Sequence, residues 1–238
     1  MDAATSAMKR QSVRLLKVLV VLVIASIGSY KTLQLDAATF DNSNTNIEVV
    51  ESPAGEALAT LPIKGRAPKT GYSRDQFGNG WSLIGECDAR NYILARDLVE
   101  ETLVTPTCKV ATGRLNDPYS GKIISFFRGA DTSDDIQIDH VVALSDAWQK
   151  GAQALTVEQR RALANDPLEL LAVEGALNQQ KSDGDAATWL PPNKSYRCAY
   201  VARQIAIKKK YSLWVTRSEY DTMADVLKTC PDQLLPTS

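Results

Sequence analysis

Short apolar runs separated by turn residues predict β-strands in the middle of the chain. Residues 109–115 (KVATGRL) and 122–127 (KIISFF) have the length and residue types of strands, and the NDPYSG between them is rich in turn formers. Apolar and polar positions alternate in residues 136–142 (IQIDHVV), as they do in a strand with one buried face. We therefore expect a hairpin followed by a third strand.

Helical signals begin after this third strand. The TVEQ sequence at 156–159 has the capping-box form, which predicts a helix to about Ala164. Pro167 ends that helix, because proline removes a backbone donor and clashes with the preceding turn. A short strand at 168–173 (LELLAV) and a helical segment at 175–181 (GALNQQK) are expected next.

Two further helices are expected near the C-terminus. Residues 195–211 form an amphipathic pattern, and the TRSE sequence at 216–219 is a second capping box that opens a helix to about Lys228. By contrast, residues 54–105 hold only short apolar pieces broken by Gly and Pro, and we expect a loop-rich lobe there. The pattern as a whole predicts an α+β fold.

The N-terminus has the pattern of an export signal. Lys9, Arg10 and Arg14 precede an apolar stretch at 18–25, which is shorter than the roughly 20 apolar residues of a spanning helix. We expect a secreted, extracellular protein, with anchoring to the outer face of the cytoplasmic membrane as the alternative. The chain divides into a signal peptide or membrane anchor (1–30), a flexible spacer (31–53) and a single domain (54–232).

The chain contains a single histidine, which limits the metal sites and catalytic mechanisms that are possible. The 238 residues carry a formal net charge of −1, and 44% of them are hydrophobic, which is an ordinary globular mixture. Zinc sites built from two or three histidines are excluded within one chain. A mechanism that needs an imidazole must therefore use His140.

Four cysteines, none of them in a CxxC pair, predict two disulfides in an exported chain. Three pairings are open. We favour Cys87–Cys108 and Cys198–Cys230, because each closes a local segment.

Charge is distributed unevenly along the second half of the chain. Residues 129–149 contain five Asp and no Lys or Arg, and residues 186–218 contain seven Lys or Arg and no acid. A basic helix is most often a solvated face. Together with the aspartates, it is also a candidate phosphate-binding surface beside a metal.

The candidate chemistry lies around His140. Asp139 precedes it at the end of the expected strand, and Asn178 and Lys181 share one face of the helical segment that follows the next strand. Two oxygen ligands suit Mg²⁺, which rarely has an all-protein cage. A neutral imidazole suits proton abstraction from water.

Longer strings carry a family resemblance. IDHVVALSDAW (138–148) and NQQKSD (178–183) resemble the motif of HNH, or His-Me finger, endonucleases, in a variant with Asp-His first and Asn last. Over about residues 55–230 the chain is similar to exported HNH nucleases related to the C-terminal domain of the GmrSD restriction enzymes. The strings that carry this similarity are KGRAPKTGYSRDQFG (64–78), CDARNYILARDL (87–98), DPYSGK (117–122) and TWLPP (188–192).

The resemblance implies a ββα-metal finger at about 134–184 and hydrolysis of DNA phosphodiester bonds, with RNA as a second substrate. It implies that His140 is the general base and that Asp139 and Asn178 bind Mg²⁺, or another divalent cation such as Mn²⁺ or Ca²⁺. Lys181 is expected to contact the phosphate. Little sequence specificity and a monomeric state are expected.

Other roles stay open. Either Asn165 or Asp166, in the turn before the second strand, is expected to support the base. Asp88 and Arg90 either lie near the site or form a salt bridge that holds the N-terminal lobe. The expected substrate-binding residues are Lys181, Arg90, Lys194 and Arg197.

Two other function classes compete with the nuclease. One is a non-catalytic, disulfide-stabilised surface module that binds an anionic polymer through residues 186–218. The other is a glycoside hydrolase that uses two carboxylates among Asp134, Asp135 and Asp146 and needs neither metal nor histidine.

Overall fold

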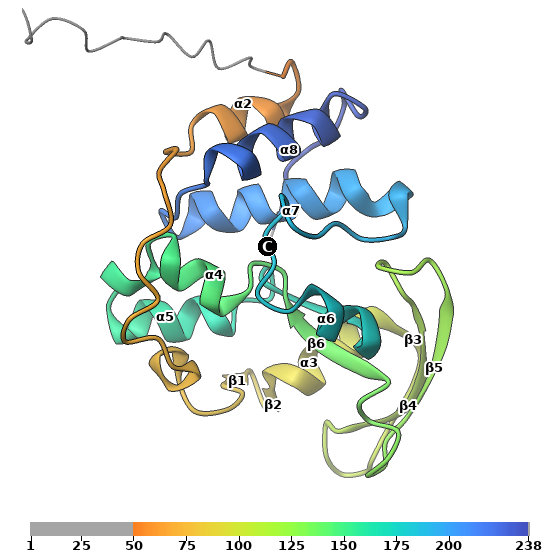
Figure 1. Cartoon of the computed structure of the whole chain (residues 1–238). Coiled ribbons are helices and arrows are strands. Elements are labelled where there is room, and N and C mark those ends of the chain that lie inside the picture. Colours follow the sequence, from red (N-terminus) through yellow and green to blue (C-terminus); the bar gives the residue numbers. More distant parts are fainter. Residues whose placement is uncertain (1–49, 238) are drawn as a thin grey trace, which may run out of the picture. The chain divides into compact units, whose positions relative to one another are not determined.

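The computed structural model describes residues 50–237, which all belong to one compact unit (Figure 1). The predicted signal or anchor (1–30) and most of the predicted spacer (31–53) lie outside the described residues. The α+β prediction is confirmed, because small antiparallel sheets combine with helices before, between and after them.

Packing begins before residue 54, where the domain was expected to start. Val50 and Ser52 are already buried. The Ser52 hydroxyl accepts a hydrogen bond from the backbone N–H of Gly55 and so caps α2 (Pro53–Ala59). The end of the predicted spacer is therefore part of the packed structure.

The largest sheet is antiparallel and has the strand order β3-β4-β5. Its strands are β3 (Leu98–Leu103), β4 (Val110–Asn116) and β5 (Ile123–Phe127). The expected hairpin is confirmed as β4 and β5. The sequence did not indicate β3, because five of its six residues are exposed and show no inward–outward alternation.

The loop-rich expectation for residues 54–105 missed a helix directly before β3. This helix is α3 (Ala89–Asp97), and Asp88 caps it by accepting a hydrogen bond from the Asn91 backbone N–H. Short elements complete the lobe: η1 (Arg74–Phe77), β1 (Leu83–Ile84) and β2 (Cys87–Asp88).

A second sheet carries the residues of interest. It pairs β6 (Ile136–His140) with β7 (Leu170–Glu174) in antiparallel register, so that His140 lies opposite Leu170. The helix α6 (Gly175–Lys181) follows β7 directly. The predicted strand–strand–helix order is present.

A helical insertion separates β6 from β7. Its elements are α4 (Leu144–Gln149), η2 (Ala152–Ala154) and α5 (Val157–Ala164). The predicted capping box at Thr156 is confirmed, since Thr156 and Gln159 exchange hydrogen bonds. The sequence did not indicate α4, which has only six residues.

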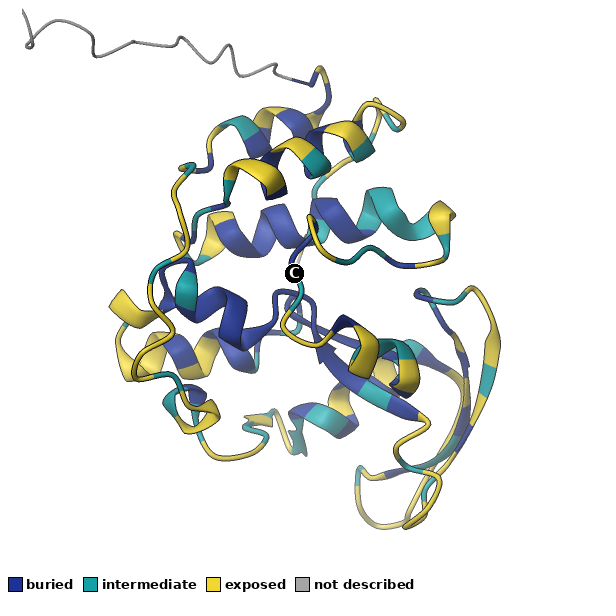
Figure 2. Ribbon diagram, in the orientation of Figure 1, coloured by how far each residue is buried: buried dark blue, intermediate teal, exposed yellow. Residues whose placement is uncertain are grey.

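The C-terminal helices confirm the sequence pattern. They follow the short η3 (Lys194–Tyr196) and are α7 (Arg197–Lys210) and α8 (Arg217–Leu227), the latter opened by the expected capping box at Thr216. These two helices and α2 pack against one another in the upper part of Figure 1. Figure 2 shows that much of α7 is buried between its neighbours.

β7 separates two hydrophobic clusters. Leu170 and Ala172 belong to the cluster shared with α3 and the three-stranded sheet, whereas Leu171 and Val173 belong to the cluster formed with the C-terminal helices. Burial on both faces explains why this strand reads as a continuous apolar run. Its partner β6 therefore ends at the boundary between the two clusters.

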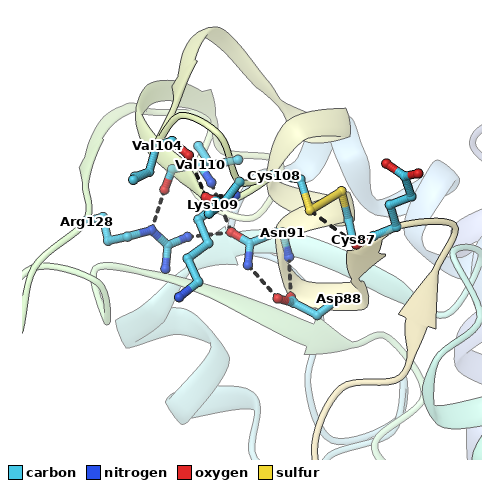
Figure 3. Close-up of a disulfide and its surroundings, with 10 residues drawn as sticks. Cys87, Asp88, Asn91, Val104, Cys108, Lys109, Val110 and Arg128 are labelled. Carbon is cyan, nitrogen blue, oxygen red and sulfur yellow. Dashed lines mark hydrogen bonds between the residues drawn. A yellow bond between two sulfur atoms is a disulfide. The ribbon is translucent and has the colours of Figure 1, made fainter.

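Both favoured disulfides are confirmed. Cys87 bonds to Cys108 and Cys198 bonds to Cys230. Figure 3 shows the first bond beside the Asp88 cap, with Asn91 linking that cap to the start of β4. No helix among residues 50–237 is long and apolar enough to cross a membrane.

Candidate active site

One cavity of about 410 Å³, called the large cavity below, gathers the three residues of the sequence hypothesis. Asp139 and His140 line it from the end of β6, and Asn178 lines it from α6. Neighbouring side chains on a strand point to opposite sides, so Asp139 and His140 share a cavity only because β6 ends there. Arg74 and Arg90 also line this cavity.

Asp139 is a buried carboxylate that accepts a hydrogen bond at each oxygen. Tyr119 Oη donates to Oδ2 at 2.5 Å, and Lys181 Nζ donates to Oδ1 at 2.9 Å. Burial raises the pKa of Asp139, although Lys181 and Tyr119 oppose this shift by stabilising the carboxylate. Each carboxylate oxygen has a second lone pair, so Asp139 can still bind a cation.

His140 is held in one tautomer by the backbone. Its Nε2 lies 3.0 Å from the Ala164 carbonyl oxygen. Because a carbonyl only accepts, the proton of the neutral ring is on Nε2 and the lone pair is on Nδ1. Burial lowers the pKa of His140 to about 3, and the positive charge of Arg74 adds to this effect. The imidazole is therefore neutral near pH 7.

The His140 ring is also fixed by an aromatic neighbour. Trp81 stacks on it with the ring centroids 5.8 Å apart and the planes 7° from parallel. The stack and the Ala164 hydrogen bond together set the orientation of the imidazole.

Asn178 lines the large cavity from α6. The Nδ2 group donates to Gln137 Oε1 at 2.9 Å, and this bond orients the amide. The Oδ1 atom has no hydrogen bond to any residue between 50 and 237 and is available as a ligand.

Lys181 does not have the position that the sequence had predicted. Its buried Nζ donates to Asp139 Oδ1 and, at 2.8 Å, to the His140 backbone carbonyl, so it ties α6 to the end of β6. Lys181 does not line the large cavity, where a phosphate contact had been expected.

Neither candidate for supporting the base contacts the imidazole through its side chain. The backbone carbonyl of Ala164, just before Asn165 and Asp166, takes that place. The expected side-chain support is therefore replaced by a main-chain contact. The side chains bind elsewhere: Asn165 with Ser82 and Arg161, and Asp166 with Leu168, Lys210 and Tyr211.

Arg90 lies at the site. The sequence had left open whether it would lie there or form a salt bridge with Asp88. It lines the large cavity, and its Nη2 donates to the carbonyls of Ser133 and Ile136 at 3.0 and 3.2 Å. No ion pair joins it to Asp88, which instead caps α3. Burial lowers the pKa of Arg90, and the nearby Arg128 adds to this effect.

The basic segment 186–218 is not a single solvent-facing surface. Lys208 is fully buried, and Arg203 donates to main-chain carbonyls around Leu168. Lys194 and Arg197 do not line the large cavity, and Arg197 donates to the Pro191 carbonyl. Lys194 and Arg197 are therefore not part of the cavity that Asp139 and His140 line.

A buried ion pair joins the acidic stretch of the chain to the basic stretch. Asp146 of the acidic stretch and Lys208 of the basic stretch lie 3.4 Å apart (N to O) in the interior. They belong to an ion cluster of three acids and three bases, called the buried ion cluster below, in which every member except the exposed Arg66 is buried. Its members are Arg66, Asp146, Lys150, Asp185, Lys208 and Glu219.

Three residues at the site were not singled out from the sequence. Tyr119 orients Asp139, Trp81 stacks on His140, and Arg74 lines the cavity with its positive charge. Arg74 and Tyr119 lie in two of the strings that carry the family resemblance, 64–78 and 117–122. Membership of those strings was the only available signal.

Two residues at this site carry oxygens that could hold a divalent cation. No group of three or more His, Cys, Asp or Glu that could hold a metal occurs within residues 50–237. Asp139 and Asn178 instead supply one carboxylate and one amide oxygen to the same cavity. This donor set suits Mg²⁺, which uses one or two protein oxygens and completes its shell with water and substrate oxygens.

Comparison with known proteins identifies the family of the chain. The family model described as "GmrSD restriction endonucleases, C-terminal domain" matches residues 88–226. An "Uncharacterized secreted protein" of Arthroderma benhamiae is 36% identical over 181 residues, which cover 75% of this chain and 85% of the relative. No solved structure matches the chain. The chain belongs to the family of GmrSD restriction endonuclease C-terminal domains.

Proposed function

We propose that this protein is an exported, metal-dependent HNH endonuclease that hydrolyses DNA phosphodiester bonds with little sequence specificity, with RNA as a second substrate. The observation that carries the proposal is the shared cavity of Asp139, His140 and Asn178. In this proposal the strand–strand–helix unit of β6, β7 and α6 is the ββα finger of that nuclease class.

His140 is the general base in this proposal. Its Nδ1 lone pair accepts a proton from the attacking water, while Ala164 holds the ring through Nε2. The low pKa of His140 keeps the imidazole neutral in the free protein, so that Nδ1 can accept a proton.

Asp139 and Asn178 would hold the cation, Mg²⁺ or another divalent cation such as Mn²⁺ or Ca²⁺. When bound, the cation supplies positive charge to the phosphate and the leaving oxygen. Tyr119 and Lys181 keep the Asp139 carboxylate in place, and Gln137 does the same for the Asn178 amide. These contacts fix the ligand oxygens before any cation arrives.

Export is supported by two observations. The relative from Arthroderma benhamiae is described as secreted, and the chain forms two disulfides, which persist in oxidising compartments. We propose release from the cell or anchoring at the outer membrane face, and action as a monomer.

The competing binding module has less support. It depended on residues 186–218 as an exposed basic surface, and the burial of Lys208 and Arg203's main-chain contacts remove part of that surface.

Supercoiled plasmid tests the proposal directly. The purified protein should convert it to nicked and linear forms in Mg²⁺ and should leave it intact in EDTA. Plasmid that stays supercoiled with every divalent cation would refute the proposed activity, and unchanged cleavage in EDTA would refute the metal requirement.

A further inference from the structure

A smaller cavity of about 150 Å³, called the side pocket below, adjoins the large cavity. Arg74, Trp81, His140 and Leu144 line both cavities and so form the boundary between them. Because His140 is the proposed base, a group that enters the side pocket lies next to the reacting phosphate. The inference drawn from this pocket rests on the proposed function.

The wall of the side pocket includes aromatic rings and two glycines. Phe77 and Trp81 contribute rings. Gly78 and Gly80 have φ values of +97° and +76°, which favour glycine. A Cβ atom at Gly80 would meet no atom within 4 Å, so the chain borders open space there.

Two polar groups in the wall already have partners. The Asn165 amide accepts from the Ser82 backbone N–H and donates to the Arg161 carbonyl, and the Ala164 carbonyl is engaged by His140. The side pocket therefore combines the Trp81 ring with an amide and a carbonyl that are already hydrogen-bonded within the protein.

Arg74 places a free positive charge at the boundary. It is exposed and makes no hydrogen bond or ion pair with any residue between 50 and 237. The other arginine of the large cavity, Arg90, is tied to two main-chain carbonyls. Arg74 is thus available to a phosphate group that lies between the two cavities.

We propose that the side pocket holds one nucleobase of the substrate strand, next to the scissile phosphate. The base stacks against Trp81, and Arg74 pairs with a backbone phosphate beside it. A cavity of about 150 Å³ accommodates one six-membered aromatic ring. The pocket therefore suits a pyrimidine better than a two-ring purine.

A base can enter the side pocket only after it leaves the duplex stack. The energy cost of this step is smallest for single-stranded or locally unpaired DNA and larger for a duplex. The substrate class of the site is accordingly unpaired DNA with a pyrimidine at one position beside the cut.

Cut-site sequencing tests the subsite. A random-sequence single-stranded DNA library and the same library made double-stranded are cleaved briefly in Mg²⁺, and the new ends are sequenced. We expect pyrimidines to be enriched about fivefold or more at one position next to the cut, and faster cleavage of single strands. Equal use of all four bases beside the cut, or faster cleavage of the duplex, would overturn the subsite while leaving the nuclease proposal intact. A protein that cuts neither library would overturn both.

Variants of Trp81 separate stacking from folding. Base preference is a ratio within one digest, so it does not depend on the fraction of active protein. Trp81→Ala should abolish the preference, Trp81→Phe should retain much of it, and the remote control Trp214→Phe should leave it unchanged. A preference that survives Trp81→Ala at full size would overturn the role of the side pocket.

Discussion

Lys150 is the centre of the buried ion cluster, and its removal should strongly destabilise the protein. The side chain is fully buried, and its Nζ lies 2.7, 2.7 and 2.6 Å from carboxylate oxygens of Asp146, Asp185 and Glu219. Lys150→Met keeps much of the volume but leaves three carboxylates facing only two cations, Arg66 and Lys208. Uncompensated buried charge is costly because it has lost its hydration.

The size of the effect follows from the burial. Removing one partner of a buried ion pair costs about 3–5 kcal/mol. For a domain of this size, each kcal/mol lowers the Tm by about 2–4 °C. We therefore expect Lys150→Met to lower the Tm by about 6–20 °C. The exposed control Lys122→Met, whose Nζ is 3.7 Å from Glu174, should change the stability by less than about 0.5 kcal/mol.

Urea unfolding followed by tryptophan fluorescence measures these free energies. A second variant tests the charge argument itself. Glu219→Gln removes one of the three acids and keeps the α8 capping box, because glutamine also serves at that position. Adding Glu219→Gln to Lys150→Met should recover part of the loss. Losses that simply add, or a Lys150→Met protein as stable as the Lys122→Met control, would refute the reasoning.

Three other predictions concern pH, metal and disulfide. Burial alone would raise the pKa of Asp185, but Lys150 and Arg66 lower it to about 2. The stability that the Asp185 carboxylate contributes is therefore present above about pH 4 and is lost as the pH falls towards 2. Asp185→Asn should lack this pH dependence in acid titrations of fluorescence. Asn178→Ala should raise the Mg²⁺ concentration for half-maximal cleavage at least about tenfold, whereas the adjacent exposed control Gln179→Ala should not; equal Mg²⁺ requirements would contradict the ligand assignment. The Cys198–Cys230 bond closes a 32-residue separation, so its removal by paired Ser substitutions should cost about 2–5 kcal/mol in urea unfolding, and an unchanged midpoint would contradict this.

Local patterns predicted much of the fold around the site. The β4–β5 hairpin, β6, β7, α6 and both capping boxes have short-range signals: turn residues, alternation, and a Thr three residues before Gln or Glu. The Asp-His and Asn positions on the second sheet and its helix were found for the same reason. Elements without such signals were missed, including the exposed β3 and the six-residue α4.

Long-range pairing could not be predicted from the sequence. Lys208 pairs with Asp146 across 62 positions and Lys150 with Glu219 across 69, so a basic stretch that reads as a surface is partly interior. The same limit applies at the site. Lys181 binds Asp139, and the Ala164 carbonyl makes the contact with His140 that was expected from a side chain. Arg74, which is 66 positions before His140 in the sequence, lines the same cavity.

The central claim is that His140 is the base of a metal-dependent nuclease, and cleavage by His140→Ala tests it most directly. Plasmid nicking in Mg²⁺ is compared between the unaltered protein, His140→Ala and the control Gln179→Ala, after circular dichroism has shown that all three are folded. We predict that His140→Ala is slower by at least about 100-fold and that the control retains full activity. Because the chain has no second histidine, cleavage by His140→Ala at a rate near that of the unaltered protein would contradict the proposed mechanism.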